Sequence, residues 1–199
     1  MTDITASTTQ LLQYFKNYFP LNEEEEERLQ VHFTERNVKR RGFILQQGEV
    51  CRHFTFVVSG CFKMYAVDSK GNEHNLQFAA ENDWITELDS FYSEKPAEVY
   101  IEAIEPSVIL QIKRPDLIRL YTTEHKIDHN FRVIIENKFI ELQKRVLQSI
   151  SSTTEERYQY FLNQYPKLSQ RIPNTQIASY LGITPEFLSK VRKNILRNL

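Results

Sequence analysis

The residues of this chain that are best placed to act on another molecule lie near its C-terminus. On a helix that buries Leu188 and Val191, the outward positions are Pro185, Glu186, Ser189, Lys190 and Arg192. Thr184 is a good N-cap and Pro185 a good first helical residue, so the helix begins here. The pattern predicts a polar helix face that reads base edges.

These residues need a second element to hold them, and the sequence predicts one immediately before. A helix that begins near Asn174 or Thr175 ends at Gly182, because glycine adopts the left-handed conformation that closes a helix. A short glycine turn between two helices is the layout of a DNA-binding helix-turn-helix. The apolar residues expected to face inward are Ile177, Ala178, Leu181, Leu188, Val191 and Ile195.

The charge distribution agrees with this interpretation. Residues 170–199 hold five basic residues and one acidic residue, although the whole chain has a net charge of −1. A concentrated basic segment on a near-neutral protein suits contact with phosphates, because each neutralised phosphate releases counterions. The alternative that spacing alone leaves open is an ordinary helical hairpin whose basic residues form a solvated face.

Length and composition limit the class of protein. With 199 residues, 41 % hydrophobic and 26 % charged, the chain is expected to form one core, or a medium domain and a small one. No run approaches the roughly 18 apolar residues of a membrane span, and the start Met-Thr-Asp-Ile-Thr does not resemble a secretion signal. We therefore expect a cytoplasmic protein without a membrane partner. Cys51 and Cys61 are interpreted as packing residues, since two isolated thiols make no disulfide framework.

Residues 1–115 are predicted to form a helical lead and a β-domain. Apolar spacing indicates two short helices between Thr8 and Phe33, the second capped by Asn22, and Glu23–Glu27 is interpreted as its solvated first turn rather than a metal site. Short β-prone runs with glycine-rich turns then indicate an antiparallel sandwich or barrel, for which a β-roll is the preferred form. These runs are 43–45, 54–58, 62–67, 75–78, 99–104 and 108–112, with a hairpin tip at 68–72.

A long helix is predicted from about His125 to Ile150, within a region spanning residues 116–151. Its apolar stripe continues for about six turns, longer than a small domain needs to cover its own sheet, so a partner helix is expected. The alternative is a helix that packs only on its own β-domain. Residues 152–199 then form the helix-turn-helix domain, which opens with a helix over 155–165. The predicted dimer-interface residues are Phe131, Ile134, Ile135, Phe139, Leu142 and Val146.

This α+β order of elements resembles the Crp/Fnr family of transcription regulators. Gln47-Gly48-Glu49 and the run from Phe56 to Gly60 are similar to that family's first β-roll turn and the strand after it, and the segment Asp68–Glu73 is similar to its hairpin. The segment Asp83–Leu88 is similar to its Gly-Asp-Phe-Ile-Gly-Glu-Leu motif. The resemblance covers nearly the whole chain. It implies a cyclic-nucleotide-binding-like β-roll, a long dimerisation helix and a C-terminal DNA-binding domain.

In cyclic-nucleotide members of the family, a Gly-Glu pair and a later Arg-Ser or Arg-Thr pair hold the ligand. These positions are Thr86 and Glu87, then Ala97 and Glu98, in this sequence. Glu87 keeps the acid that meets a ribose hydroxyl, but the arginine is missing and Glu98 would repel a cyclic phosphate. The resemblance therefore implies a degenerate effector pocket that does not bind cyclic AMP through the usual cassette. No cofactor is predicted, and an unidentified small-molecule effector stays open.

The resemblance also assigns the DNA contacts. The family's base-reading positions fall on Pro185, Glu186 and Lys190, with Ser189 between them, and proline cannot act as a basic base reader. Further predicted contacts to phosphate, or caps, are Thr175, Gln176, Thr184, Arg192 and Lys193. The partners implied are duplex DNA with a pseudo-palindromic operator, a second copy of the chain, and RNA polymerase as a further candidate. Only Ile195 to Leu199 are expected to follow the second helix, which leaves little or no wing strand.

Two other classes of function stay open. A ligand-binding or scaffold protein would use its helix-turn-helix for protein contacts, and the near-neutral total charge favours that reading somewhat. A cupin-like metal oxygenase would need two or three converging histidines and a carboxylate, whereas His53 and His74 stand alone. His125 and His129 have a two-ligand helical spacing without a further ligand nearby. We therefore expect no metal and no enzymatic activity.

Overall fold

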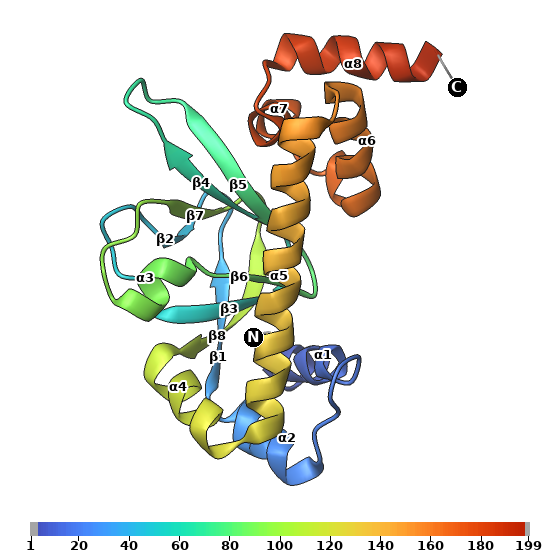
Figure 1. The fold of residues 1–199 in the computed structure, drawn as a ribbon. Coiled ribbons are helices and arrows are strands. Elements are labelled where there is room, and N and C mark those ends of the chain that lie inside the picture. The colour runs from blue at the N-terminus through green and yellow to red at the C-terminus, as the bar shows by residue number, and fades with distance from the viewer. Residues whose placement is uncertain (1–3, 198–199) are drawn as a thin grey trace. The chain divides into compact units, whose positions relative to one another are not determined.

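The computed structural model describes residues 4–197 and shows an α+β chain (Figure 1). The described residues divide into two compact units. Unit 1 comprises residues 4–64 and 78–136, and unit 2 comprises residues 65–77 and 137–197. The segment 65–77, which contains the predicted hairpin tip, thus belongs with the C-terminal helices. The division at residues 115 and 151 stays a prediction.

The strands form two four-stranded sheets, which confirms the predicted antiparallel roll. In spatial order the first sheet is β1 (Phe33–Val38), β8 (Ser107–Lys113), β3 (His53–Ser59) and β6 (Asp83–Ile85). The second is β2 (Phe43–Leu45), β7 (Tyr100–Ala103), β4 (Phe62–Val67) and β5 (Glu73–Ala79). Strand β8 lies between β1 and β3, with Ile112 opposite both Phe33 and Phe54.

Helices precede, interrupt and follow these strands. The two N-terminal helices appear as predicted, and the Asn22 side chain accepts from the Glu25 N–H in a capping box that starts the second. The long helix also appears as predicted and contains 27 residues. The helices are α1 (Ile4–Phe15), α2 (Glu23–Gln30), α3 (Leu88–Ser93), α4 (Arg114–Thr123), α5 (His125–Ser151), α6 (Thr154–Gln164), a 3₁₀ turn η1 (Leu168–Gln170), α7 (Asn174–Leu181) and α8 (Pro185–Arg197).

An aromatic cluster around Trp84 forms the core of unit 1. The Trp84 ring lies 5.0 Å from Phe56 and 5.2 Å from Phe131, measured between ring centroids. Phe131 comes from the first part of α5 and is fully buried. Burial of several aromatic rings, each of which removes a large apolar area from water, fixes α1 and the start of α5 against the first sheet. The cluster comprises Tyr14, Phe15, Phe33, Phe54, Phe56, Trp84 and Phe131.

The sequence-based assignment misses several elements and misplaces one residue. Strands β1 and β6 and helices α3 and α4 were not predicted, and Phe33 was assigned to the second helix although it begins β1. Helix α2 ends at Gln30, and Phe33 pairs with Ile112 of a strand that lies far along the chain. Such non-local pairing overrides local helical spacing.

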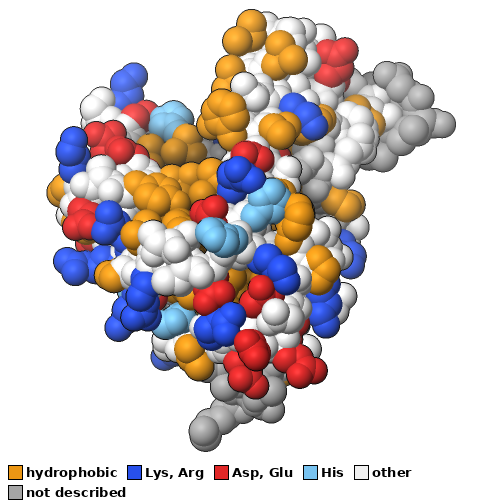
Figure 2. Space-filling model, turned by 60° about the horizontal axis from the view of Figure 1, so that its bottom comes forward, with side chains coloured by type: hydrophobic (Ala, Val, Ile, Leu, Met, Phe, Trp, Pro, Cys, Tyr) orange, Lys and Arg blue, Asp and Glu red, His pale blue; other side chains and the backbone are white. Residues whose placement is uncertain are grey.

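The surface carries charges of both signs. On the face drawn in Figure 2, Lys and Arg side chains alternate with Asp and Glu rather than gathering into a field of one sign. This mixture agrees with the net charge of −1 for the whole chain. Among residues 4–197, no helix combines the length and the hydrophobicity needed to cross a bilayer.

Candidate nucleic-acid interface and effector domain

The C-terminal helices of unit 2 form the predicted pair joined by a glycine turn. Gly182 has φ 68° and ψ 35°, the left-handed conformation, and closes α7. The Thr184 hydroxyl accepts from the Phe187 N–H at 3.2 Å, so Thr184 caps α8 as predicted. At the start of α7, by contrast, the N-cap is Pro173 and neither Asn174 nor Thr175 caps the helix.

A small apolar core holds α8 by one face. Leu188 and Val191 are buried, as predicted, and face residues of α6 and α7. The Phe161 ring of α6 lies against the Tyr180 ring of α7, with ring centroids 5.5 Å apart and the two planes tilted by 53°. The predicted inward residues Ile177, Ala178 and Leu181 of α7 are buried too. Because the apolar face of α8 is fixed inward, its polar face must point away from this core.

The predicted contact residues on α8 are mostly exposed. Glu186, Ser189, Lys190 and Lys193 are exposed, and Pro185 is half-buried. Ser189 donates from its hydroxyl to the Pro185 carbonyl at 3.0 Å. The side chains of Glu186, Lys190 and Lys193 make no hydrogen bond or ion pair within the described chain.

Arg192 is engaged within the helix pair. Its guanidinium donates to the Asn174 side-chain oxygen at 2.6 Å and so ties α8 to the first turn of α7. Thr175, on that same turn, is exposed. Arg192 therefore helps to position α8 against α7, and its contact with a phosphate stays a prediction.

Gln176 is engaged by the hairpin of β4 and β5, which the sequence did not predict. The Asn75 side-chain amide donates to the Gln176 side-chain oxygen at 2.8 Å and to its backbone carbonyl at 3.0 Å. The Gln176 amide donates in turn to the Glu73 carboxylate at 3.3 Å. The Ser179 hydroxyl donates to the Glu73 carbonyl at 2.6 Å and accepts from the Asn75 N–H at 3.1 Å.

Arg145 of α5 reinforces this contact. Its guanidinium donates to the carbonyls of Asn75 and Tyr180 at 2.9 and 3.0 Å, and also to the carbonyl of Leu76. The guanidinium carbon lies 3.9 Å from the centroid of the Tyr180 ring, a cation–π arrangement. Within unit 2, the Arg145 cation thus holds the end of α7, the start of β5 and the C-terminal part of α5 together.

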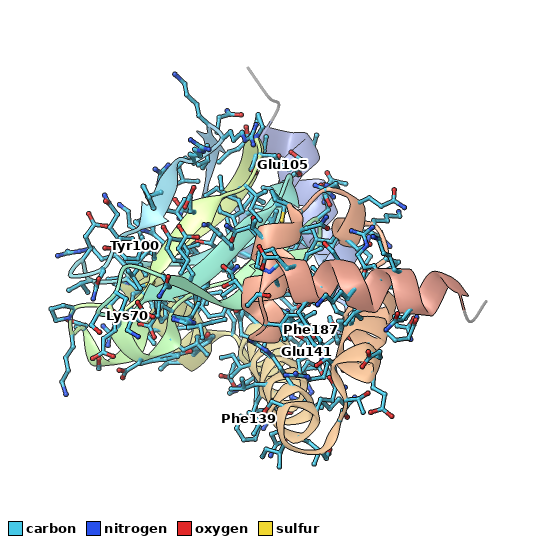
Figure 3. The ribbon with its side chains drawn as sticks, turned by 90° about the horizontal axis from the view of Figure 1, so that it is seen from above. Lys70, Tyr100, Glu105, Phe139, Glu141 and Phe187 are labelled. Atoms are coloured by element: carbon cyan, nitrogen blue, oxygen red, sulfur yellow. The ribbon has the colours of Figure 1, made fainter. Side chains whose placement is uncertain are left out.

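Phe187 is an exposed apolar residue on α8 that the sequence analysis did not select. Its side chain, labelled in Figure 3, is 43 % exposed. In sequence it lies about one turn before Lys190 on the same helix. Its position directly after Pro185 and Glu186 could have identified it, because a large apolar side chain on a predicted polar face needs a partner.

The second half of α5 exposes an apolar stripe. Ile135, Phe139, Leu142 and Val146 follow a four-three-four spacing, and the last three are 59 %, 54 % and 49 % exposed. The Phe139 side chain projects outward from the helix (Figure 3). The interface prediction is wrong for Phe131 and Ile134, because both are buried in the core of their own chain. Helix α5 therefore packs on its own domain over its first part and exposes an apolar seam over its second.

The four cassette positions lie in unit 1 and are largely occupied by local structure. Both carboxylate oxygens of Glu87 accept hydrogen bonds from the first turn of α3, from Asp89 N–H at 3.2 Å and Ser90 N–H at 2.6 Å. The Thr86 hydroxyl accepts from the Thr55 N–H at 3.2 Å. Ala97 is buried and exchanges backbone hydrogen bonds with residues 48 and 49, whereas Glu98 is exposed. Glu87 acts here as a helix cap, which the sequence did not predict.

The cysteines and histidines of the described residues form neither a disulfide nor a metal site. Cys51 and Cys61 are buried and form no disulfide with each other, and burial raises the pKa of the Cys51 thiol to about 11. His129 lies edge-on to Phe19 at a ring-centroid distance of 3.8 Å. Within residues 4–197, no three His, Cys, Asp or Glu side chains converge as a metal site.

Comparison with known proteins agrees with this architecture. Residues 35–124 match the model of the cyclic nucleotide-binding domain. The chain is 25 % identical over 197 residues to the probable transcriptional regulator flp of Lacticaseibacillus casei, covering 95 % of this chain and 87 % of that one. FixK2 from Bradyrhizobium japonicum has the same fold, with a TM-score of 0.74 and 18 % identity over 83 % of this chain and 85 % of that chain.

A further solved structure bears on the family. It is described as a transcriptional regulator of the Crp/Fnr family from Eubacterium rectale, with a TM-score of 0.69 and 19 % identity, and the likeness covers 92 % of this chain and 88 % of that one. Of these similar proteins, flp and the Eubacterium rectale protein are described as transcriptional regulators. Residues 35–124 thus match the cyclic nucleotide-binding domain, and the chain is distantly similar, over most of its length, to proteins described as transcription regulators.

Proposed function

We propose that this chain is a transcription regulator of the Crp/Fnr type, a cytoplasmic homodimer that binds a pseudo-palindromic DNA operator through α8. The observation that carries the proposal is the exposed face of Glu186, Ser189, Lys190 and Lys193 on a helix fixed by the buried Leu188 and Val191. An exposed polar face on a rigidly held helix is what major-groove reading requires. Glu186 accepts from cytosine, Lys190 donates to guanine or phosphate, and Thr175 and Arg192 contact the backbone.

The seam of Ile135, Phe139, Leu142 and Val146 supports the dimer. An apolar four-three-four stripe that is half-exposed along a helix fits a parallel partner helix with the same stripe. Two-fold symmetry would set the two copies of α8 about 34 Å apart, one helical turn of DNA. The operator is then a pair of inverted half-sites, and RNA polymerase is a candidate partner for a regulator bound there.

A gel-shift titration with operator and random duplexes tests the DNA function. We expect Lys190→Ala to weaken binding to the selected operator by about 1–3 kcal/mol and to relax base preference at one position. Lys167→Ala is the matched control, because Lys167 is an exposed lysine of the same unit outside α7 and α8. Equal losses on operator and random DNA would make Lys190 a phosphate contact instead.

A second candidate function is a scaffold whose helix pair makes protein contacts. Two observations favour it: the exposed Phe187 on α8, and the hydrogen bonds by which the hairpin engages Gln176 and Ser179. Competitor DNA separates the two functions. A true operator complex survives an excess of random duplex at moderate salt, whereas purely electrostatic binding does not.

The effector domain is proposed not to bind cyclic AMP through the usual cassette. Both carboxylate oxygens of Glu87 already accept hydrogen bonds from the first turn of α3. Ala97 and Glu98 provide no cationic group for a phosphate. Isothermal titration with cyclic AMP should show no micromolar binding. Micromolar binding that Glu87→Ala abolishes would contradict this part of the proposal.

A further inference from the structure

Unit 1 contains a cavity of about 450 Å³ that opens into the β-roll. Its walls come from both sheets, since β1, β3, β6 and β8 of the first sheet and β2 and β7 of the second contribute residues. None of Thr86, Glu87, Ala97 or Glu98 is among its lining residues. The cavity is therefore lined by a different set of side chains from the cassette, and its volume is within the range of small-molecule sites.

One part of the lining is basic. Arg36, Arg52 and His53 line the cavity. Burial, followed by the nearby charges of Lys113 and the two arginines, lowers the pKa of the His53 imidazole. Within residues 4–197, the side chains of Arg52, His53 and Lys113 make no hydrogen bond or ion pair. The acid on the wall is Glu49, which accepts from the Gln46 N–H at 2.9 Å.

The remaining lining combines apolar walls with a buried polar pair. Ile85 and Ile101 are almost fully buried and face the cavity. Thr55 and Gln111 are also buried, and the Gln111 amide donates to the Thr55 hydroxyl at 3.1 Å. A basic opening above apolar walls is complementary to a molecule with an anionic end and an apolar body.

From this arrangement we infer that the roll binds a small organic carboxylate, with its carboxylate at Arg36 and Arg52 and its apolar body against Ile85 and Ile101. An arginine pair recognises a carboxylate through charge-assisted hydrogen bonds. The Arg36 guanidinium already donates to the Phe43 carbonyl at 3.1 Å, which fixes its position at the edge of β1. Gln111 and Thr55 orient any polar group that the ligand carries further in.

The inference rests on the proposed function of this domain as an effector domain, and its test uses no DNA. Isothermal titration with 4-phenylbutyrate and with its neutral amide gives two affinities, and their ratio measures how much the negative charge of the ligand contributes to binding. We expect saturable binding of the carboxylate, at least about tenfold tighter than the amide. Inorganic phosphate, an anion without an apolar body, should bind more weakly than 4-phenylbutyrate.

Two arginine variants test whether 4-phenylbutyrate binds in this cavity. Arg52→Gln should weaken 4-phenylbutyrate binding by about tenfold or more, and Arg52 is exposed without side-chain partners, so the fold is retained. Arg40→Gln is the matched control, because Arg40 is an exposed arginine outside the cavity lining. Amide shifts of Thr55 and Gln111 on titration, followed by NMR, report binding inside the roll.

Several results would overturn the inference: no binding of 4-phenylbutyrate, equal affinity for its amide, equal affinity for phosphate, or no effect of Arg52→Gln. Failure of the DNA function gives a different pattern. In that case no operator is retarded in the gel shift, while 4-phenylbutyrate still binds and still depends on Arg52.

Discussion

The side-chain amide of Asn75 donates two hydrogen bonds to Gln176, one to its side-chain oxygen at 2.8 Å and one to its backbone carbonyl at 3.0 Å. The two residues are 101 positions apart in sequence, and both belong to unit 2. The hairpin of β4 and β5 thereby occupies a polar side chain at the start of α7 that is predicted to contact DNA. In this conformation Gln176 is not available to a phosphate.

Replacing Asn75 should therefore raise DNA affinity. Asn75→Asp removes the amide donor and places a carboxylate against two acceptor oxygens of Gln176, so the hairpin should release α7. We expect operator binding to tighten by about fivefold, equivalent to ~1 kcal/mol. Gel-shift titration measures the operator affinity of the variant and of the parent. Asn163→Asp, on exposed α6 surface, adds the same charge without touching the hairpin and should leave affinity unchanged.

Unchanged operator affinity in Asn75→Asp would show that the hairpin contact does not compete with DNA. The Asn75 N–H donates to the Ser179 hydroxyl, so protection of the Asn75 amide from hydrogen exchange reports separately whether the contact has been broken. A variant that loses this protection without a gain in affinity contradicts the prediction outright.

The local signals in the sequence were sufficient for the helix pair. Gly182 and the Thr184–Pro185 start are features of a few adjacent residues, and both act as predicted. The inward positions Leu188 and Val191 follow from the helical repeat and are buried. Such features are decided within one or two turns of chain, so a sequence pattern is enough to specify them.

Features that depend on distant residues were not predictable in the same way. Strand β1 exists because β8, some 75 positions later, pairs with it, and the segment itself contains Glu35, Arg36 and Asn37, which are poor strand formers. Likewise, the sequence identifies Glu87 as an acid in a family motif but does not reveal that it caps α3. The burial of Phe131 and Ile134 depends on the aromatic cluster around Trp84, which no helical stripe indicates.

Gly60 is expected to be intolerant of substitution. Its φ is 93°, and an added Cβ would lie 2.7 Å from the Ser107 Cα, which belongs to backbone and cannot move aside. Gly60→Ala should lower the free energy of unfolding by about 3 kcal/mol or more, combining backbone strain with overpacking. Urea denaturation followed by circular dichroism measures this loss.

Gly71 supplies the matched control for that substitution. Its φ is 83°, similar to Gly60, but an added Cβ would meet nothing within 4 Å. Gly71→Ala should therefore show the backbone strain alone, about 1–2 kcal/mol. If the two variants lost equal stability, the close approach of Ser107 would not matter.

His53 should make the protein less stable in mild acid. Burial, followed by the nearby charges of Lys113, Arg36 and Arg52, holds the pKa of its imidazole below the ordinary value of 6.5. The unfolded chain therefore binds a proton at a higher pH than the folded one, and stability is lost as pH falls from about 6.5 through the folded pKa. His53→Gln removes the pH-dependent contribution of this imidazole to the free energy of unfolding. The stability of the variant relative to the parent should therefore improve as the pH falls from about 7 to about 5.

Two measurements check the His53 prediction. NMR titration of the imidazole should give a pKa below 6.5, and urea denaturation of parent and variant at several pH values should give the predicted change in their difference. A pKa above 6.5 would reverse the sign of the effect. It would mean that an acid, and not the basic cluster, controls His53.

The exposed apolar seam on α5 is expected to form the dimer interface. Leu142 is 54 % exposed in the single chain, so Leu142→Asp should not disturb its folding. In a dimer, the new carboxylates would be buried without partners, and we expect the dimer dissociation constant to rise by about 100-fold, ~3 kcal/mol. Asn137→Asp, on the opposite side of α5 from the seam, adds the same charge and should leave assembly unchanged. Sedimentation equilibrium measures both variants, and operator affinity should fall only with Leu142→Asp, because two half-sites need two linked copies of α8. If Leu142→Asp still sedimented as a dimer with parental affinity, the partner helix would have to use another face of α5.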